Sequence, residues 1–361
     1  MGIERDILLN PGPVNVSERV RAALTRGDAC HREPEVAASV AGVRRALLDL
    51  FAPADEFDAV LFTGSGTAAM EAAVCSTPAP GAGLLVIDNG VYGARLAAIA
   101  EAHSIATERI TCAWDERPDL DRIDAALAAD GAIDSIALVH HETTTGLINP
   151  VEAVGRLARK HGKRFILDTV SGLAGEALDL ERAGVDVAVS TANKCIAGIP
   201  GIAFVLVRRT LLERLRSQPD RSVYLSIALN HAAQADACGA FTPAIQVLWA
   251  LEEALRELAE EGVDARIARF AGASSLIRKA GDELGLTRLI APELSSNTIT
   301  AFELPTGRSY AWLHDACKKR GFVIYAGQGP LEGRIFRVAT MGQVATADYE
   351  RFTDVLRSLL S

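Results

Sequence analysis

The stretch VSTANKCIAGIPG, residues 189–201, contains the end of a predicted buried strand. An apolar run ends in small polar residues, and a single lysine, Lys194, follows between an asparagine and a cysteine. Burying a lysine amine costs free energy unless the amine is paired or chemically used. A lysine at the end of a buried strand therefore indicates a reactive amine in a ligand site. A surface lysine in a loop is the alternative.

Short β-rich runs alternate with longer helical stretches through the middle of the chain. The β-rich runs are DAVLFTG (58–64), GLLVIDNG (83–90), DSIALVHH (134–141), KRFILDT (163–169), DVAVST (186–191) and IAFVLVRR (202–209). Nearly continuous runs of Val, Ile and Leu are typical of strands buried on both faces of a sheet. The pattern predicts an α/β fold with a mostly parallel sheet and crossover helices.

The pattern changes after a long helical run, IQVLWALEEALRELAEEG (245–262). Beyond it, short strands and helices mix as in an α+β unit. We therefore predict three parts. These are an N-terminal segment (1–20) that packs with a small domain, a large domain (21–255), and the small C-terminal domain (256–361).

Composition and charge argue against several classes of protein. The chain has 361 residues, of which 49% are hydrophobic and 23% charged, with a formal net charge of −9. This acidic balance argues against nucleic-acid binding, and no apolar run reaches membrane-spanning length. The first residues do not resemble a signal peptide, and six cysteines without a C-x-x-C pair indicate reduced thiols. We therefore expect a cytoplasmic protein without nucleic-acid or membrane partners.

A glycine-rich turn, FTGSGTAAMEAA (62–73), follows one predicted strand and opens a helix. Its SGT residues would place backbone N–H groups and hydroxyls at the helix N-terminus, which suits a phosphate. The spacing G-x-G-x-x-A also fits a dinucleotide site, with Asp88 as the ribose acid. A nucleotide-binding oxidoreductase and a tight turn without a ligand are therefore alternatives.

Asp168 ends another predicted strand and lies 26 residues before Lys194. The carboxyl ends of strands in an open α/β sheet form the edge where ligands bind. Pyridoxal phosphate needs an anchor for its phosphate, a carboxylate for its pyridine nitrogen and an amine for its Schiff base. The combination predicts a pyridoxal phosphate site, although Asp168 taken alone also fits a helix N-cap or a turn.

The sequence resembles the class V aminotransferases, which have the fold type I architecture, over nearly the whole chain. The segments that carry the resemblance are LLNPGPVNV (8–16), DNGVYGARL (88–96), HHETTTGLINP (140–150), STANKCIAGIPG (190–201) and GFVIYAG (321–327). The resemblance implies a large domain with a mostly parallel seven-stranded sheet, a smaller α+β domain, and a homodimer with shared active sites. Within the family, the nearest likeness is to the enzymes that move the amino group of 2-aminoethylphosphonate to pyruvate.

The resemblance also implies roles for individual residues. Lys194 resembles the Schiff-base lysine and Asp168 the partner of the pyridinium nitrogen, and these two are the expected catalytic residues. Arg337 resembles the arginine that grips the substrate carboxylate, because a guanidinium pairs with both carboxylate oxygens. The residues expected to bind the cofactor are Ser65, Gly66, Thr67, Tyr92, Thr143, Asp168, Lys194 and Thr242. Of these, Thr242 resembles a residue that reaches the phosphate of the neighbouring subunit.

The segment CHREPE (30–35) departs from the aminophosphonate enzymes, which carry an acidic tract with tryptophan there. We expect Arg32 to meet the phosphonate or a carboxylate of the amino donor, near the loop formed by residues 10–13. A solvated Arg32 paired with a neighbouring glutamate is the alternative. No metal site is expected, because the adjacent His140 and His141 point to opposite faces of a strand.

The predicted reaction is therefore the pyridoxal phosphate-dependent transfer of an amino group from 2-aminoethylphosphonate to pyruvate, giving phosphonoacetaldehyde and alanine. An alanine– or serine–glyoxylate aminotransferase is the first alternative, since the NPGP and HREPE segments also suit that branch. A pyridoxal phosphate lyase or desulfurase is a weaker one, because no cysteine lies in an evident mobile loop. A binding protein without catalysis is the least favoured alternative, because it would not explain why Lys194, Asp168 and the glycine-rich turn occur together.

Overall fold

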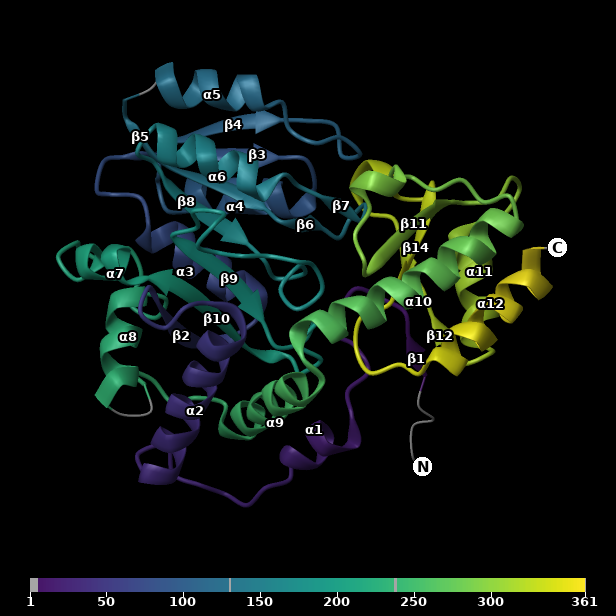
Figure 1. The fold of residues 1–361 in the computed structure, drawn as a ribbon, viewed down its shortest axis with the longest axis horizontal. Helices are drawn as coiled ribbons and strands as arrows, with labels where there is room; N and C mark the ends of the chain where they lie inside the picture. The colour runs from purple at the N-terminus through teal and green to yellow at the C-terminus, as the bar shows by residue number, and fades with distance from the viewer. Residues whose placement is uncertain (1–5, 130, 237–238, 361) are drawn as a thin grey trace.

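A seven-stranded sheet forms the centre of the larger lobe in the computed structural model, which describes residues 6–129, 131–236 and 239–360 (Figure 1). In spatial order its strands are β2 (Phe57–Gly64), β10 (Gly201–Arg208), β9 (Val187–Thr191), β8 (Arg164–Asp168), β5 (Ile133–Val139), β3 (Gly83–Asp88) and β4 (Thr107–Thr111). Strand β10 is antiparallel to both of its neighbours, and the other pairs are parallel. The predicted α/β class and the mostly parallel sheet are therefore confirmed. The edge strand β4 was not predicted.

Helices cover both faces of this sheet. One face carries α3 (Gly66–Ser76), α4 (Val91–Ala102), α7 (Arg209–Leu215) and α8 (Ile227–Asp236). The other face carries α2 (Pro34–Phe51), α5 (Leu120–Ala129), α6 (Val151–Lys160) and α9 (Ile245–Glu261), with α1 (Glu18–Ala23) packed on α9. On β2, Val60 packs into the core beneath α3 and α4, whereas Ala59 and Leu61 pack into the core beneath α2 and α9. Successive side chains of a strand point to opposite faces, which explains this alternation. Burial on both faces explains why the strand sequences are apolar throughout.

The second lobe is built on a three-stranded antiparallel sheet, seen on the right of Figure 1. Its strands are β11 (Ile299–Glu303), β14 (Ile335–Ala339) and β13 (Tyr325–Ala326). The helices α10 (Val263–Glu283), α11 (Tyr310–Lys318) and α12 (Thr346–Leu360) belong to the same lobe, with the short helices η1 (Pro292–Leu294) and η2 (Gly329–Leu331). Phenylalanines from β11, β14 and α12 fill its core.

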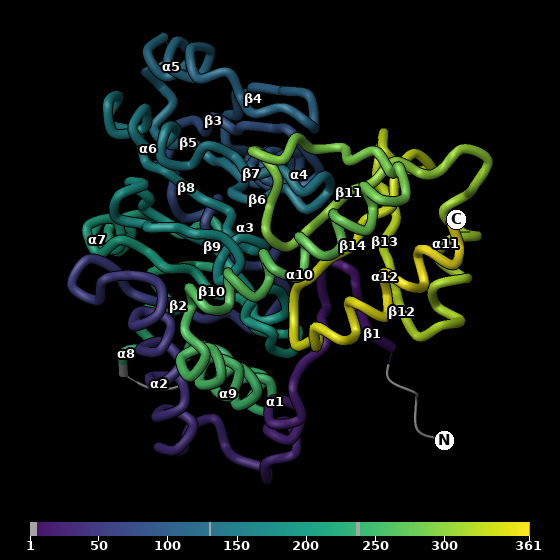
Figure 2. Tube along the Cα trace, turned by 45° about the vertical axis from the view of Figure 1, so that its right-hand side comes forward, coloured from purple at the N-terminus to yellow at the C-terminus, as the bar shows by residue number. Residues whose placement is uncertain are grey.

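The start of the chain runs along this second lobe. Strand β1 (Ile7–Leu8) pairs in parallel with β12 (Phe322–Val323). Figure 2 shows the chain passing from β1 to α1, beside α9 of the larger lobe. The N-terminal segment thus touches both lobes, and the division at residues 20 and 255 stays a prediction.

No helix in the described ranges is both long and apolar enough to cross a membrane. The described cysteines, Cys30, Cys75, Cys112, Cys195 and Cys317, are unpaired, and Cys238 lies outside the described residues.

Candidate active site

The carboxyl ends of the parallel strands bring most of the predicted site residues to one edge of the sheet. Strand β8 ends at Asp168, β9 ends three residues before Lys194, and β2 ends where the turn into α3 begins. A cleft of about 530 Å³ opens at this edge. The predicted residues that line it are Ser65, Gly66, Thr67, Tyr92 and Lys194.

Lys194 is buried in this cleft. Its Nζ donates a hydrogen bond to the carbonyl oxygen of Pro11, and the amine has no carboxylate partner among the described residues. Burial lowers the pKa of Lys194 to about 8. The backbone of Gly12, at a φ of +94°, passes so close that a Cβ atom there would lie 2.8 Å from Lys194 Cδ. A buried amine with a lowered pKa is suited to act as a nucleophile and as a base.

Asp168 is only 3% exposed and is not among the residues that line the cleft. Its Oδ1 accepts a hydrogen bond of 2.8 Å from the backbone N–H of Val170, a residue that lines the cleft. Burial raises the pKa of Asp168 to about 6, and the nearby charges of Lys194 and Arg95 oppose that shift. A buried carboxylate among cations is suited to hold a protonated ring nitrogen.

The N-terminus of α3 offers a site for an anion. The first N–H groups of a helix lack partners within the helix, and the N-cap Ser65 makes no side-chain capping bond. Glycine at position 66 lets the turn pass Val170, since a Cβ there would lie 3.1 Å from Val170 Cγ2. The turn therefore leaves its backbone donors open toward the cleft.

Arg95 adds a positive charge beside this turn and was not predicted. Its Nη1 donates to Thr67 Oγ1 at 3.3 Å, and its guanidinium lies 4.8 Å from the centre of the Tyr92 ring. It lines the cleft and has no ion pair within the described ranges. The segment DNGVYGARL contains Arg95, but nothing in its sequence tells that the side chain reaches back to the turn before α3.

Arg337 enters from β14 of the second lobe and is fully buried. Its Nη1 donates to the carbonyl of Thr143 at 2.7 Å, and its Nε and Nη2 donate to the carbonyl of Ala326 at 2.9 and 2.5 Å. The Tyr325 ring centre lies 4.9 Å from the guanidinium. No carboxylate of the described chain pairs with Arg337. An uncompensated buried cation is costly, so the arrangement is suited to an anion supplied from outside.

Three buried polar atoms near the end of β5 have no hydrogen-bond partner in the described chain. They are His140 Nδ1, His141 Nε2 and Thr143 Oγ1. Burial lowers the pKa of His140 to about 4 and that of His141 to about 3, so both rings are neutral at neutral pH. Buried polar atoms are normally bonded, so each of these orphaned atoms is a candidate contact for a polar ligand. This agrees with the predicted role of Thr143.

Glu142 connects the hairpin β6 (His141–Glu142) and β7 (Leu147–Ile148) to α4. Its carboxylate accepts hydrogen bonds from the backbone N–H of Tyr92 at 3.1 Å and of Thr144 at 3.0 Å. Burial raises the pKa of Glu142 to about 7. Through its bond to the Tyr92 N–H, the Glu142 carboxylate holds the first turn of α4 in place. This role of Glu142 was not predicted.

Arg266 on α10 holds the turn that follows Lys194. It is fully buried, and its Nη1 donates to the carbonyl of Cys195 at 3.0 Å while its Nε pairs with Glu261 at 2.5 Å. Cys195 itself donates from Sγ to the carbonyl of Ser171 at 3.3 Å, and burial raises its pKa to about 12. Cys195 is therefore unsuited to act as a nucleophile.

Thr242 and Arg32 do not join this group within one chain. Thr242 is exposed and lines a small hollow beside Tyr224, two residues before the cleft residue Ala244. Arg32 is exposed just before α2 and is not among the residues that line the cleft. Their roles stay predictions.

Two further expectations concern residues outside the cleft. The loop of residues 10–13, expected near Arg32, contacts Lys194 through Pro11 and Gly12. Asp88, the ribose acid of the dinucleotide alternative, pairs with Arg109 at 2.6 Å and does not line the cleft. The geometry therefore gives no support to the dinucleotide alternative.

Comparison with known proteins agrees with this geometry. Residues 15–339 match the family described as aminotransferase class-V. The chain is 37% identical over 365 residues to a 2-aminoethylphosphonate–pyruvate transaminase of Vibrio vulnificus, covering 98% of this chain and 97% of the relative. It is 38% identical over 357 residues to the transaminase of the same name from Vibrio cholerae, covering 97% and 96%.

Solved structures show the same fold. A subgroup IV aspartate aminotransferase from Thermus thermophilus superposes with a TM-score of 0.90 and 31% identity, covering 98% of this chain and 99% of the other. An alanine–glyoxylate aminotransferase from Nostoc superposes with a TM-score of 0.93 and 27% identity, covering 100% and 97%. The predicted resemblance is confirmed, and the chain belongs to the class V aminotransferases of fold type I.

Proposed function

We propose that this aminotransferase uses pyridoxal phosphate to transfer the amino group of 2-aminoethylphosphonate, or of a closely related aminophosphonate, to pyruvate. The products are phosphonoacetaldehyde and alanine. The observation that carries the proposal is that a buried amine of lowered pKa, Lys194, lines the cleft and lies within the electrostatic influence of Arg337, a fully buried guanidinium without a carboxylate partner in the described chain. The full-length relatives named for this reaction support the choice of substrates.

The residues of the cleft suit pyridoxal phosphate. We assign the phosphate to the N-terminus of α3 and Arg95, the ring nitrogen to Asp168, and one ring face to Tyr92. The orphaned hydroxyl of Thr143 is assigned to a polar substituent of the ring. When bound, pyridoxal phosphate supplies an electron sink that stabilises negative charge at the carbon bearing the amine.

The protein's own residues perform the remaining steps. Lys194 Nζ accepts the proton from the substrate carbon and later donates it, acting first as base and then as acid. The Asp168 carboxylate keeps positive charge on the ring nitrogen. Arg337 orients the anionic end of each substrate in turn, first the phosphonate of the donor and then the carboxylate of pyruvate, because its planar fork suits both.

We further propose a homodimer with shared active sites. Thr242 is exposed close to the cleft and shares a small hollow with Tyr224 and Phe241, and the large apolar side chains Val223, Tyr224, Leu229 and Phe241 are exposed in the single chain. Such an apolar surface is unusual on a monomer and suits a second copy of the chain. The unpaired cysteines favour a reducing compartment, and we keep the cytoplasm as the proposed location.

Substrate profiling tests this proposal against the alanine– or serine–glyoxylate alternative. The loaded enzyme is assayed with 2-aminoethylphosphonate, alanine and serine as donors and with pyruvate and glyoxylate as acceptors. We expect the highest kcat/KM for 2-aminoethylphosphonate with pyruvate. A higher kcat/KM for alanine or serine with glyoxylate would overturn the assignment.

The same assay tests Arg32. Replacing it with alanine should raise KM for the true donor, because a cation that meets the phosphonate or carboxylate is lost. An unchanged kcat/KM with every donor would remove this role.

A further inference from the structure

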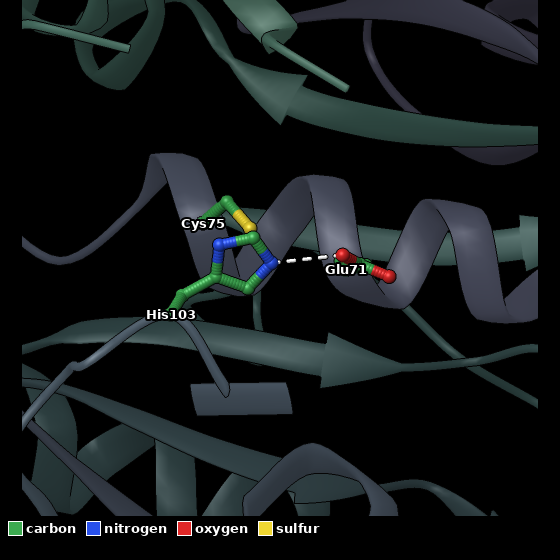
Figure 3. A group of neighbouring side chains, drawn as sticks. All are labelled: Glu71, Cys75 and His103. Carbon is green, nitrogen blue, oxygen red and sulfur yellow. Dashed lines mark hydrogen bonds and ion pairs between the residues drawn. The ribbon is translucent and has the colours of Figure 1, made fainter. Parts of the chain in front are cut away.

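Three side chains of metal-ligand type meet outside the cleft. Glu71 and Cys75 lie one turn apart on α3, and His103 is the C-cap of α4 (Figure 3). The carboxylate, the thiol and the imidazole each offer a ligand atom, and these atoms all lie within 4.8 Å of one another. His103 Nε2 is hydrogen-bonded to Glu71 Oε1 at 2.8 Å, as the dashed line in Figure 3 marks.

The ligand set and its spacing suit zinc. Thiolate sulfur, imidazole nitrogen and carboxylate oxygen are the three ligand types that zinc takes in proteins. A tetrahedral zinc ion with bonds of about 2.0–2.3 Å holds its ligand atoms roughly 3.5 Å apart. The ligand atoms, which lie within 4.8 Å of one another, would therefore have to approach by at most roughly 1.3 Å to reach this spacing. Residues i and i+4 of a helix already share one face, which aligns Glu71 with Cys75.

The surroundings leave the cluster available to a cation. Cys75 is buried, whereas His103 and Glu71 are partly exposed, so an ion and a bound water can reach the site from solvent. The nearby Arg221 is engaged by the backbone carbonyls of Cys75, Pro78 and Ala79 and makes no ion pair with Glu71 in the described chain.

We propose that Glu71, Cys75 and His103 form a zinc site, with water as the fourth ligand. Zinc replaces the hydrogen bond between His103 and Glu71, and the proton of the Cys75 thiol is released to solvent as the thiolate binds. An open fourth position distinguishes the site from a closed structural zinc site of four protein ligands.

The site joins the far ends of the two helices that open onto the cleft. Helix α3 begins at the anion-binding turn, and Cys75 lies nine residues further, roughly 14 Å along the helix axis. Helix α4 begins beside Tyr92 and ends at His103. Zinc therefore fixes α3 against α4 without touching the reacting groups, and it stabilises the fold rather than taking part in the chemistry.

Equilibrium dialysis of the full-length holoenzyme against zinc tests the proposal, with bound zinc counted per chain by atomic absorption. We expect one tightly bound zinc per wild-type chain, lost in Cys75→Ser and in His103→Gln. Cys112→Ser is the matched control, because Cys112 is a partly buried cysteine outside the cluster, and it should retain the zinc. Wild-type protein without tightly bound zinc, or Cys75→Ser protein that binds as the wild type does, would overturn the proposal.

Two additional measurements separate ligand loss from misfolding. Glu71→Gln changes only a half-exposed carboxylate and should weaken zinc binding at least about tenfold with an unchanged circular dichroism spectrum. Cobalt in place of zinc should give a thiolate-to-metal absorption band in the wild type and in Cys112→Ser but not in Cys75→Ser. Transaminase activity of Cys75→Ser, measured without zinc, should equal that of the wild type. A cobalt–thiolate band that persists in Cys75→Ser would place the metal at another cysteine and contradict the assignment.

Discussion

Arg337 and Arg266 are both fully buried, yet their surroundings differ. Arg266 pairs with the carboxylate of Glu261 at 2.5 Å and donates to a backbone carbonyl beside Lys194. Arg337 donates only to backbone carbonyls and has no carboxylate partner in the described chain. A buried cation neutralised by its own chain suits a structural role, whereas one left without an anion suits the role we propose for Arg337, which is to bind the anionic group of a substrate.

The two arginines act on the same lysine by different routes. Arg266 holds the backbone of the turn that follows Lys194, through the carbonyl of Cys195. Arg337 acts through space, since its positive charge adds to the burial that lowers the pKa of Lys194. Substitutions at the two positions should therefore change different measurable quantities.

Arg337→Met should have the largest effect on activity. We expect kcat/KM for pyruvate to fall at least about 100-fold, since breaking a buried charge-assisted contact costs about 3 kcal/mol or more. The free energy of unfolding should fall by less than about 1 kcal/mol, because the substitution also removes an uncompensated buried charge. Steady-state kinetics and urea denaturation provide the two numbers.

Arg337→Lys is the matched control that separates the effect of the positive charge from the effect of the planar guanidinium. It keeps the charge but loses the planar fork, so its kcat/KM should lie between those of the wild type and Arg337→Met. If Arg337→Met lost as much free energy of unfolding as Arg266→Met, which breaks a buried ion pair, the proposed difference between the two arginines would be contradicted.

Arg266→Met should instead affect the fold and the position of Lys194. We expect the free energy of unfolding to fall by about 2–3 kcal/mol, because Glu261 and the carbonyl of Cys195 lose a buried donor. The turn after Lys194 is then less well held, so kcat should fall roughly tenfold while KM for pyruvate stays unchanged.

Arg269→Met provides the control, because Arg269 also pairs with Glu261, at 2.7 Å, and does not bond to the turn after Lys194. Its kcat should equal that of the wild type. An equal loss of kcat in both variants would show that Arg266 has no positioning role.

Arg95 resembles Arg337 in that its positive charge has no carboxylate partner in the described chain, but its side chain is only half buried. Arg95→Met should raise the dissociation constant of pyridoxal phosphate about tenfold, since a hydrogen bond to a charged group is worth about 1.5–3 kcal/mol and partial exposure weakens it. Fluorescence titration of the apoenzyme measures this constant. Arg45→Met, at an exposed position on α2, should leave it unchanged. Identical constants for both variants would remove Arg95 from the phosphate site.

The smallest expected effect is on the pH dependence of the rate at which the apoenzyme captures pyridoxal phosphate. This pH dependence should nevertheless distinguish Arg337→Met clearly from Arg266→Met. Burial lowers the pKa of Lys194 from 10.5 to about 8, so the neutral amine is half populated near pH 8 and its fraction levels off about one pH unit above that midpoint. The rate at which the apoenzyme captures pyridoxal phosphate should follow this curve in stopped-flow absorbance.

Arg337→Met should move the midpoint of that curve to higher pH, because a charge that lowers the lysine pKa is removed. Arg266→Met should leave the midpoint in place. A rate that keeps rising to pH 10 in the wild type would contradict the lowered pKa.

Local pattern was enough to predict six of the seven strands of the central sheet and the placement of Lys194 and Asp168 after strand ends, while their roles stay predictions. Lys194 and Asp168 follow apolar runs, and in a parallel sheet such positions meet at one edge. Strand β4 was missed because its sequence, TERIT, is mostly exposed at the sheet edge and lacks an apolar run. The predicted boundaries of the other central strands agree closely with the structure because those strands are buried on both faces.

The roles of Arg266 and Arg95 could not be predicted, because their partners are distant in sequence. Arg266 and Cys195 are 71 residues apart, and Arg95 and Thr67 are 28 apart. Only the packed fold shows that one arginine bonds to the turn after Lys194 and that the other bonds to Thr67 in the first turn of α3. The role of Thr242 rests on the proposed second chain and stays a prediction.

The most direct test of the central claim is the absorbance spectrum of the purified protein loaded with pyridoxal phosphate, recorded before and after adding 2-aminoethylphosphonate. We expect a visible band that requires Lys194. The donor should convert this band to the near-ultraviolet band of the pyridoxamine form, and pyruvate should restore it. Without a visible band, the role of Lys194 would be contradicted. A visible band that responds to alanine or serine but not to 2-aminoethylphosphonate would contradict the proposed donor.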